Sequence, residues 1–465
     1  MSTGDPTARL VVVGGGVAGL AAAWEATGRG ARVTVLEAED RFGGLVRTSR
    51  IELDGGDLLV DEGADAFLAR VPDAVELCAE LGLSDELVPP DTAHARVWVD
   101  GHLLPLPGRH ALGVPLDPED PATVALLGSP TIEHIREELE REGPGLQGDT
   151  SIGAFVGGRL GREVVDRIVG PLVGGISAGD VDRLSLVSVT PQLADAARQG
   201  DSFVGALRRA VATVDADRPV FAGLRGGTEQ LVTALVDRLA DRGVELLTGR
   251  PVTQVVGRGS DLRVETVDTH HDADGVVVAT PARTAARILE GLSTEAAQDL
   301  RSIPTTTVVL VTFVFARDQV PGPLDGSGFL VPRDAGLLST AVSWGSSKWG
   351  HWDDGRHVVL RVSAGHAGDR RVESLGDDEV VELLLDDLGT TMGVAGPPRS
   401  TRVSRWTDAF PQYEVGHEER LARIDAALRR DASQVRLAGM SYRGVGIPAS
   451  IRTARAAARS LLTPR

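Results

Sequence analysis

Three glycines and one carboxylate near the N-terminus have the spacing most specific for chemistry. Gly14, Gly16 and Gly19 form the pattern G-x-G-x-x-G, and Glu37 follows the first of them by 23 positions. In this pattern the glycines allow a tight turn, close approach of the backbone to a pyrophosphate, and close packing of a helix on a strand. A carboxylate at that distance accepts hydrogen bonds from a ribose hydroxyl. The spacing therefore predicts a dinucleotide-binding site.

Two strands and a helix must hold these residues in place. Residues 10–13 are a continuous apolar run, as expected of a strand that is buried on both faces of a parallel sheet. The glycines then open an alanine-rich helix, and residues 32–36 form a second strand that leads into Glu37. The positive end of the helix would face the phosphates. A lone glycine triplet is weak evidence, but here strand, glycines, helix, strand and acid follow in order.

A second glycine pair directly after the acid distinguishes between two classes of cofactor. Residues 41–44 read Arg-Phe-Gly-Gly. This arrangement resembles the superfamily of flavin-dependent amine oxidases and porphyrinogen oxidases more than it resembles nicotinamide dehydrogenases. FAD is therefore the expected cofactor.

Composition and charge argue against several other functions. The 465 residues include 48 basic and 66 acidic side chains, and this formal charge of −18 disfavours nucleic acid as a main partner. Cys78 is the only cysteine, which excludes an intramolecular disulfide and a cysteine-ligated cluster. The ten histidines show no metal-binding spacing, so no metal is expected.

The N-terminal apolar run lacks the basic region of a signal peptide, and no run is long enough to span a bilayer. A cytoplasmic protein without stable membrane insertion is expected.

The order of segments predicts three domains in a chain about three times as long as a typical domain. Buried strands at 274–279 and 435–439 return to the nucleotide-binding layer, so that domain is expected to be discontinuous. Strands of antiparallel character follow from residue 305, whereas short helices, including the charged segment 131–142, lie between. The fold class is thus α/β, a discontinuous Rossmann-like FAD-binding domain with an antiparallel-sheet substrate domain and a small helical domain. The expected bounds are 1–80, 220–300 and 430–465 for the FAD-binding domain, 81–106, 185–219 and 301–429 for the substrate-binding domain, and 107–184 for the helical domain.

Five further segments resemble the protoporphyrinogen and coproporphyrinogen oxidases, and with the N-terminal unit they extend over almost the whole chain. Each alone could be an ordinary loop, but their joint order is much harder to obtain by chance. The segments are 62–68 (EGADAFL), 170–186 (GPLVGGISAGDVDRLSL), 346–349 (SSKW), 405–417 (RWTDAFPQYEVGH) and 439–448 (GMSYRGVGIP).

The resemblance implies flavin contacts at residues from several of these regions. Val252 would meet the adenine, Trp406 would line the isoalloxazine, and the helix that begins near Gly446 would stabilise the negative charge of reduced flavin at its N-terminus. The implied contact residues are Gly14, Gly15, Gly16, Gly19, Glu37, Ala38, Arg41, Gly44, Gly63, Ala64, Asp65, Val252, Trp406, Gly446 and Ile447.

The chain departs from its relatives at two of these places. Relatives often have Asp-Cys after the proline where this chain has Ala449-Ser450, and Gly-Pro-Asp-Ser where it has Gly63-Ala64-Asp65-Ala66. At the second place the contact is expected to be made mainly by backbone groups.

The resemblance implies an FAD-dependent oxidase of heme biosynthesis. It would convert coproporphyrinogen III into coproporphyrin III in three two-electron steps, with O2 as acceptor, H2O2 as product and hand-off of the porphyrin to a later enzyme of the pathway. Because the flavin accepts the hydride, no catalytic side chain is assigned, and Lys348 fits a surface or structural role at least as well. Arg70 is a candidate for contact with a substrate propionate, although solvation at the surface is its simpler role.

Three alternatives remain open from the sequence. Protoporphyrinogen IX could be the substrate instead. A flavin amine oxidase would share the nucleotide site and would need Lys348 near the flavin, but SSKW and PQYEVGH fit that class poorly. A non-catalytic flavoprotein that binds and hands over a tetrapyrrole is the third alternative.

Overall fold

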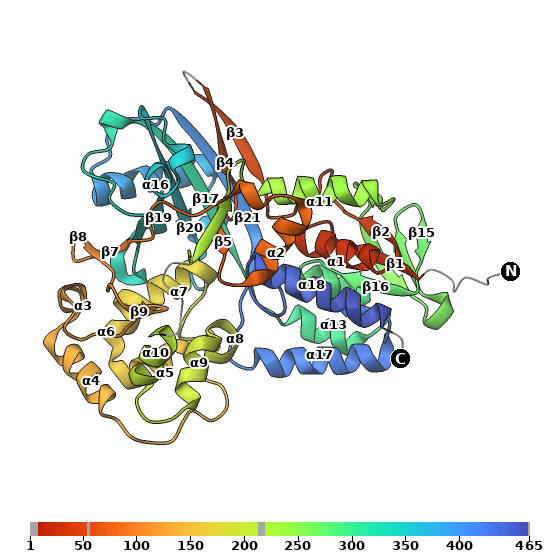
Figure 1. Cartoon of the computed structure of the whole chain (residues 1–465), viewed down its shortest axis with the longest axis horizontal. Helices are drawn as coiled ribbons and strands as arrows, with labels where there is room; N and C mark the ends of the chain where they lie inside the picture. The colour runs from red at the N-terminus through yellow and green to blue at the C-terminus, as the bar shows by residue number, and fades with distance from the viewer. Residues whose placement is uncertain (1–7, 54–55, 213–218, 464–465) are drawn as a thin grey trace.

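The computed structural model describes residues 8–53, 56–212 and 219–463 and shows three parts packed against one another (Figure 1). A parallel sheet covered by helices lies on the right of the view, a larger sheet at the upper left, and a group of short helices at the lower left. The expected α/β class with a second sheet and a helical part is confirmed.

A five-stranded parallel sheet forms the centre of the first part. Its central strand is buried on both faces, because residues 10–13 are each at most 2% exposed. Two of its strands come from far along the chain, so this part is discontinuous, as predicted. From edge to edge the strands are β12 (Glu245–Leu247), β2 (Arg32–Leu36), β1 (Arg9–Val13), β16 (Gly275–Val278) and β22 (Val435–Leu437).

Helices cover both faces of this sheet. On one face, α1 (Val17–Gly28) packs against α18 (Ile447–Leu462), and the fully buried Ala21, Ala22 and Ala23 permit a close approach. The other helices on this face are α2 (Pro72–Leu81) and α11 (Glu229–Asp241). The opposite face carries α12 (Ala282–Leu289), α13 (Thr294–Arg301) and α17 (His417–Asp431).

Two small antiparallel units lie outside this sheet, and the first packs Ile51 and Val60 against Val314 and Val359 of the larger sheet. The first is a hairpin of β3 (Thr48–Leu53) and β4 (Gly56–Asp61). The second contains β13 (Val252–Val256), β14 (Arg263–Thr266) and β15 (His270–Asp272).

A seven-stranded sheet forms the second part. Neighbouring strands are antiparallel except β18 and β7, which pair in parallel, and β7 comes from a distant, earlier segment. Helix α16 (Asp377–Met392) packs on the sheet through Val380, Leu384 and Leu388. In order the strands are β21 (Ser400–Pro411), β17 (Thr305–Ala316), β20 (His357–Ala364), β19 (Ser339–Trp344), β18 (Gly328–Leu330), β7 (Ala95–Val99) and β8 (His102–Pro105).

Short helices around a separate apolar core form the third part. The charged segment is helix α4, which buries Ile132 and Ile135 and exposes Glu133, Arg136 and Glu137, as its sequence pattern predicts. The helices are α3 (Pro121–Leu126), α4 (Ser129–Leu139), α5 (Ile152–Leu160), α6 (Arg162–Val164), α7 (Gly170–Ser177), α8 (Leu186–Val189), α9 (Pro191–Arg198) and α10 (Phe203–Ala212).

Two expected domain assignments need adjustment. Residues 185–219 were expected in the substrate domain, but α8, α9 and α10 share the apolar core of α4 and α5, and residues 213–218 lie outside the described residues. Helix α17 was also expected there, yet Leu421 and Ile424 pack with the parallel sheet. In both cases apolar faces, which the order of elements does not reveal, decide where the helix packs.

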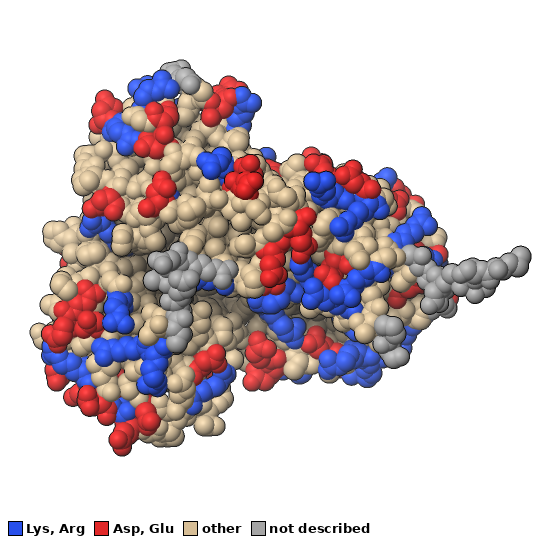
Figure 2. Space-filling view, viewed as in Figure 1, with Lys and Arg blue, Asp and Glu red and all other residues tan. Residues whose placement is uncertain are grey.

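Basic and acidic side chains are interspersed over the molecular face in Figure 2. On α18, for example, Arg455 is paired with Glu80 and Arg459 with Glu25. In the described part of the chain, no helix is long and apolar enough to cross a membrane.

Candidate functional site

The glycine turn between β1 and α1 contains two kinds of glycine. A Cβ atom at Gly19 would lie 1.8 Å from the carbonyl oxygen of Gly14, and one at Gly14 would lie 2.7 Å from that of Ala279, so both are required by the packing of the protein itself. Gly16 differs, because its Cβ would have no neighbour closer than 4.0 Å and its φ is −70°. The turn therefore leaves space at Gly16, at the N-terminus of α1, where a pyrophosphate fits.

Glu37 lies at the end of β2, beside this turn. Its Oε2 accepts a hydrogen bond from the N–H of Gly15 at 2.6 Å, and its Oε1 accepts one from Glu39 at 2.9 Å. Each oxygen keeps a lone pair for a ribose hydroxyl. The backbone of Arg250 donates to the Glu37 carbonyl at 2.8 Å, which brings the start of β13 at Val252 to this end of the site. Ala38 is exposed at the same place.

The second glycine loop is shaped by Arg41. Its guanidinium donates to the carbonyl oxygens of Phe42 at 2.8 Å, Gly44 at 2.6 Å and Val46 at 3.2 Å. Gly44 has a φ of +57°, and a Cβ added at Gly44 would lie 3.5 Å from the Cα of Gly16. Arg41 thus fixes the loop against the glycine turn, whereas direct contact between Arg41 and the cofactor stays a prediction.

The loop formed by residues 62–65 is held by three successive carbonyl oxygens. That of Glu62 accepts from Trp406 Nε1 at 2.9 Å, that of Gly63 from Arg361 Nη2 at 2.5 Å, and that of Ala64 from Thr228 Oγ1 at 2.9 Å. A Cβ at Gly63 would lie 2.4 Å from the Leu45 carbonyl oxygen, so this loop touches the second glycine loop.

The backbone of this loop suits the expected contact with an acceptor-rich ligand. No described residue accepts a hydrogen bond from the N–H of Gly63 or Ala64, and Ala64 is exposed. The fixed carbonyls leave these donors free to bind such a ligand.

The carboxylate of Asp65 is the centre of an ion-pair cluster under the loop. It is 2.9 Å from Lys348 Nζ, 2.9 Å from Arg361 Nη1 and 3.0 Å from Trp349 Nε1. Burial raises the pKa of Asp65, but the charges of Lys348 and Arg361 and the Trp349 hydrogen bond outweigh burial, so its pKa lies well below the ordinary value. Asp65 is therefore ionised and holds the loop against β20.

The segment that precedes α18 is fixed by two stacked rings. The hydroxyl of Tyr413 donates to the Met440 carbonyl at 2.5 Å and accepts from the Gly444 N–H at 3.0 Å. The ring of His417 lies 4.2 Å from that of Tyr413, and its Nε2 is 2.8 Å from the Tyr442 carbonyl oxygen. Burial lowers the pKa of His417 to about 4, so the ring is neutral near pH 7 and Nε2 donates to that carbonyl.

The N-terminus of α18 is open, as the candidate flavin contact requires. Gly446 precedes the helix with a φ of +107°, which favours glycine, and no atom lies within 4 Å of where its Cβ would be. Ile447 is the first helical residue, and Pro448 follows in the first turn, where its missing N–H costs nothing.

Several residues of the site were not found from the sequence. Thr280 follows β16, next to Gly14, and its buried hydroxyl has no partner among the described residues. Its place after a central parallel strand is a signal that could have found it. Arg361 is 5% exposed within an apolar strand, and a charged residue in such a run also indicates a specific partner.

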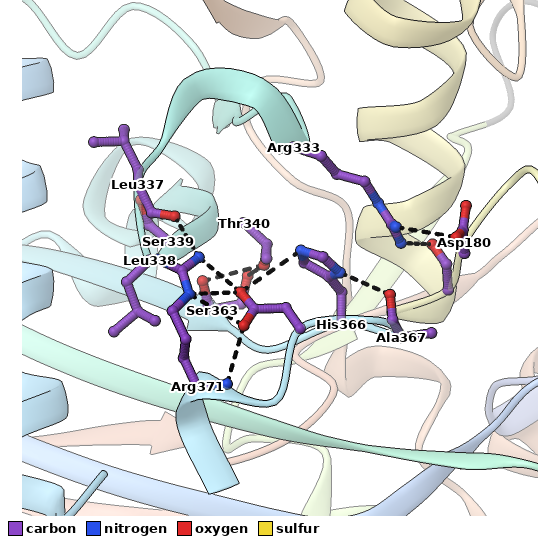
Figure 3. Close-up of polar contacts among 12 residues, drawn as sticks. Asp180, Arg333, Leu337, Leu338, Ser339, Thr340, Ser363, His366, Ala367 and Arg371 are labelled. Atoms are coloured by element: carbon purple, nitrogen blue, oxygen red, sulfur yellow. Dashed lines mark hydrogen bonds and ion pairs between the residues drawn. The ribbon is translucent and has the colours of Figure 1, made fainter. Parts of the chain in front are cut away.

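The segment 177–185 fastens the helical part to the rest of the molecule. Figure 3 shows Arg333 extending towards Asp180, and its Nη2 donates to the Gly179 carbonyl at 2.7 Å. The backbone of Ala367, next to His366, donates to the Ala178 carbonyl at 2.8 Å. Ser185 donates to the carbonyl of Tyr413 at 2.8 Å, so the helical part also reaches the segment that supports α18.

Arg70 and a pair of apolar residues lie beyond the loop at residues 62–65. Strand β5 (Phe67–Leu68) pairs with β11 (Phe221–Leu224), and the partners Leu68 and Phe221 are 44% and 38% exposed. Arg70 follows β5 and is also exposed, so contact with a propionate stays a prediction.

Comparison with known proteins identifies the class to which this arrangement belongs. A family model described as flavin containing amine oxidoreductase matches residues 17–462. The chain belongs to this family. Among curated members, the coproporphyrinogen III oxidase of Propionibacterium freudenreichii subsp. freudenreichii is 36% identical over 97% of this chain and 90% of its own length. That of Bacillus subtilis (strain 168) is 30% identical over 99% of both.

A solved structure of a similar protein has the same architecture. A protein from Exiguobacterium sp. 255-15, provisionally named a protoporphyrinogen oxidase, superimposes with a TM-score of 0.87 at 28% identity and covers 99% of each chain. The predicted family resemblance is thereby confirmed.

The residues of the site fit the flavin of this family. Gly16 leaves room for a pyrophosphate, Glu37 can bind a ribose, Thr280 offers a buried hydroxyl, and the loop at residues 62–65 presents its N–H groups. The cofactor is FAD, and the chain is an FAD-dependent oxidoreductase. In the described residues, no group of three or more metal-ligating side chains gathers that could hold a metal ion.

Proposed function

We propose that this chain oxidises coproporphyrinogen III to coproporphyrin III, with O2 as the electron acceptor and H2O2 as the second product. The observation that carries the proposal is its similarity, over nearly its whole length, to curated coproporphyrinogen III oxidases of two bacteria. The segments that support this resemblance are also the ones that build the site. Lys348 and Trp349 bind Asp65 of the loop at residues 62–65, and Trp406 binds the Glu62 carbonyl. Tyr413 binds Gly444, just before the last helix.

The proposed reaction requires the protein to bind and orient the flavin and the substrate rather than to transfer protons. When bound, the flavin supplies the acceptor for a hydride from the macrocycle. Gly16 and Glu37 would hold the nucleotide end, while the loop at residues 62–65 and the N-terminus of α18 would fix the ring. The partial positive charge of that helix end favours the negative charge that the site must accept on reduction. No side chain is assigned as an acid or base.

The substrate preference is supported by the surface beside the loop. The pyrrole rings of the macrocycle are apolar, and the exposed pair Leu68 and Phe221 offers an apolar surface to them. Coproporphyrinogen carries four propionates, whereas protoporphyrinogen carries two propionates and two vinyl groups. Arg70, two residues after Leu68, would bind a carboxylate and so favour the former.

The test is a comparison of kcat/KM for the two porphyrinogens under identical conditions. We expect coproporphyrinogen III to be the better substrate, with coproporphyrin III and H2O2 as products. A clear preference for protoporphyrinogen IX would reject the substrate assignment and would favour the alternative.

The other two alternatives are tested by the same purified protein. An amine oxidase would need Lys348 beside the flavin, but its Nζ is engaged by Asp65 at 2.9 Å. We therefore expect no turnover of primary or secondary amines. Anaerobic mixing with coproporphyrinogen III should bleach the flavin absorbance, whereas a non-catalytic tetrapyrrole carrier would leave it unchanged.

We further propose a cytoplasmic location and hand-off of the porphyrin to a later enzyme of the heme pathway. The charged outer face of α4 supports the first part, because such a face is unsuited to burial in lipid. After cell lysis we expect activity in the supernatant without detergent, and recovery in a carbonate-resistant pellet would contradict it. Hand-off would appear as faster use of the enzyme-bound porphyrin than of free porphyrin.

A further inference from the structure

Charges of both signs surround the loop at residues 62–65, and all of them except the half-exposed Arg47 are largely buried. Asp65 lies between Lys348 and Arg361, whose side chains are 18% and 5% exposed. Two further carboxylates adjoin the loop, and one of them lies 3.4 Å from an arginine nitrogen. The carboxylates are Asp61, Glu62 and Asp65, and the cations are Arg47, Lys348 and Arg361. Three potential negative charges thus face three positive ones.

These charges lie at the redox-active end of the cofactor site. Glu37 marks the ribose of the adenine half, and Gly16 marks the pyrophosphate. From Gly16 the site continues along Gly44, and Leu45 touches the loop at Gly63. The flavin half therefore extends towards the loop at residues 62–65, which is fixed by the ion pair of Asp65 with Arg361.

The positive charge of Lys348 is held in a fixed position near the flavin end of the site. Its Nζ is bound to Asp65 and lies 5.1 Å from the centroid of the Trp349 ring, so it is held in a fixed position under the loop. A fixed charge in a poorly solvated region acts on a nearby charge far more strongly than one at the surface. Reduction adds negative charge to the flavin. Loss of one cation would leave the cluster with an excess negative charge and would oppose reduction.

We propose that Lys348, held by Asp65, is a positioning residue that sets the reduction potential of the bound flavin. It acts through the loop at residues 62–65 and does not react with the substrate. The inference depends on FAD being bound and not on the identity of the porphyrinogen.

The first test uses the fact that Lys348 is the only lysine of the chain. Protein labelled with [13Cε]lysine should give a single side-chain signal. We expect that signal to move when apo-protein binds FAD, and to move again when dithionite reduces the flavin. In Asp65→Asn, which loses the anion that holds Nζ, the signal should approach the value of free lysine. A signal unaffected by FAD or by its reduction would overturn the proposal.

The second test measures the midpoint potential of the flavin in purified holo-protein by titration against reference dyes. Lys348→Met should weaken the binding of reduced relative to oxidised FAD by about tenfold, which equals a potential lower by about 30 mV for a two-electron couple. Lys348→Arg should restore the potential because it keeps the charge and the partner. Asp65→Asn should shift the potential in the opposite direction. Opposite shifts would show that the role is electrostatic. If Lys348 had only a structural role, both substitutions would weaken the binding of oxidised and reduced FAD alike and would not shift the potential in opposite directions.

Arg356→Met provides the matched control. Arg356 also belongs to the sheet part and is a cation, but its side chain is 59% exposed and pairs with Asp354. Its removal should change the ratio of the affinities for reduced and oxidised FAD by no more than about twofold, since solvent screens exposed charges. The potential should therefore stay close to that of the original protein. If Lys348→Met does not fold, Asp65→Asn and Lys348→Arg carry the test. Equal potentials in the Lys348→Met, Asp65→Asn and Arg356→Met proteins would overturn the proposal, whatever the substrate proves to be.

Discussion

At Gly16 a side chain would collide with a cofactor but not with the protein. The position has ordinary helical N-cap geometry, with φ −70° and ψ 177°, and a Cβ would have 4.0 Å of space. Aspartate is a favourable N-cap residue, so Gly16→Asp should fold with unchanged or slightly raised apo-stability. The carboxylate would occupy the pyrophosphate position and repel it. We expect loss of the yellow flavin absorbance, measured as the ratio of the visible absorbance of oxidised flavin to the absorbance of the protein.

Gly19→Ala is the comparison for this variant. Its Cβ would lie 1.8 Å from the Gly14 carbonyl oxygen, so this substitution should lower the free energy of unfolding itself, by more than about 2 kcal/mol. Full flavin occupancy in Gly16→Asp would show that the pyrophosphate does not lie at this turn.

His417 makes stability depend on pH. Burial lowers the pKa of His417 to about 4 in the folded protein, against 6.5 for the ordinary side chain. Below pH 6.5 the unfolded chain therefore binds a proton that the folded chain does not, so the free energy of unfolding falls as the pH drops from about 6.5 to about 4. The difference in pKa corresponds to a loss of about 3 kcal/mol in the free energy of unfolding over this range. Chemical denaturation at a series of pH values measures it.

His417→Gln is the variant that isolates this effect. Glutamine can still donate to the Tyr442 carbonyl but does not titrate, so the stability of the variant should change less between pH 6.5 and 4. An equally steep fall in the variant would assign the pH dependence to other groups. Asp65 adds to the fall only below about pH 5, where the unfolded chain begins to bind a proton that the folded chain, with its lowered pKa, does not bind.

The segment before α18 is an element whose shape depends on one hydroxyl. Tyr413→Phe keeps the ring stacked on His417 but leaves the Gly444 N–H and the Met440 carbonyl without their partner. An unpartnered buried group costs about 1–3 kcal/mol. Since Gly446 lies two residues further on, we expect the affinity for FAD to fall by about tenfold, with near-native secondary structure.

Tyr442→Phe is the matched control for that change. It also removes a buried hydroxyl from the same region, but its bond to the Thr280 carbonyl is longer, at 3.3 Å, and Gly444 keeps its acceptor. Its Kd for FAD, determined by fluorescence titration of apo-protein, should stay within about twofold of the original. A greater loss in Tyr442→Phe than in Tyr413→Phe would show that the Tyr413 hydroxyl does not shape the helix start.

The sequence predicted the elements of the nucleotide site because each is encoded locally. The apolar run at residues 10–13, the glycines and Glu37 lie within one short stretch, and the structure assembles them as expected. Contacts between distant segments were not accessible in this way. The ion pairs of Asp65 with Lys348 and Arg361 join residues almost 300 positions apart, and the parallel pairing of β7 with β18 crosses more than 200. Such pairs depend on how the parts pack against one another, and the hydrophobic periodicity of the sequence does not reveal this packing.

At the scale of the whole molecule, FAD should connect segments that the chain itself leaves far apart. The expected contacts include Gly16 on the first strand-helix turn, the loop at residues 62–65, and Gly446 before the last helix. A ligand that binds only the folded state stabilises it by about 2.7 kcal/mol when its free concentration is 100 times the Kd.

We therefore expect apo-protein to unfold at a lower temperature than holo-protein, and FAD to raise the midpoint progressively with its concentration. Because the cofactor would join the first and last elements of the parallel-sheet part, the gain should appear in α1 and α18 together when hydrogen exchange is measured by mass spectrometry. FMN, which lacks the adenosine half, should not reproduce the full shift, since it cannot reach Glu37. Protection confined to α1, with α18 unchanged, would contradict the placement of the flavin ring at the start of the last helix.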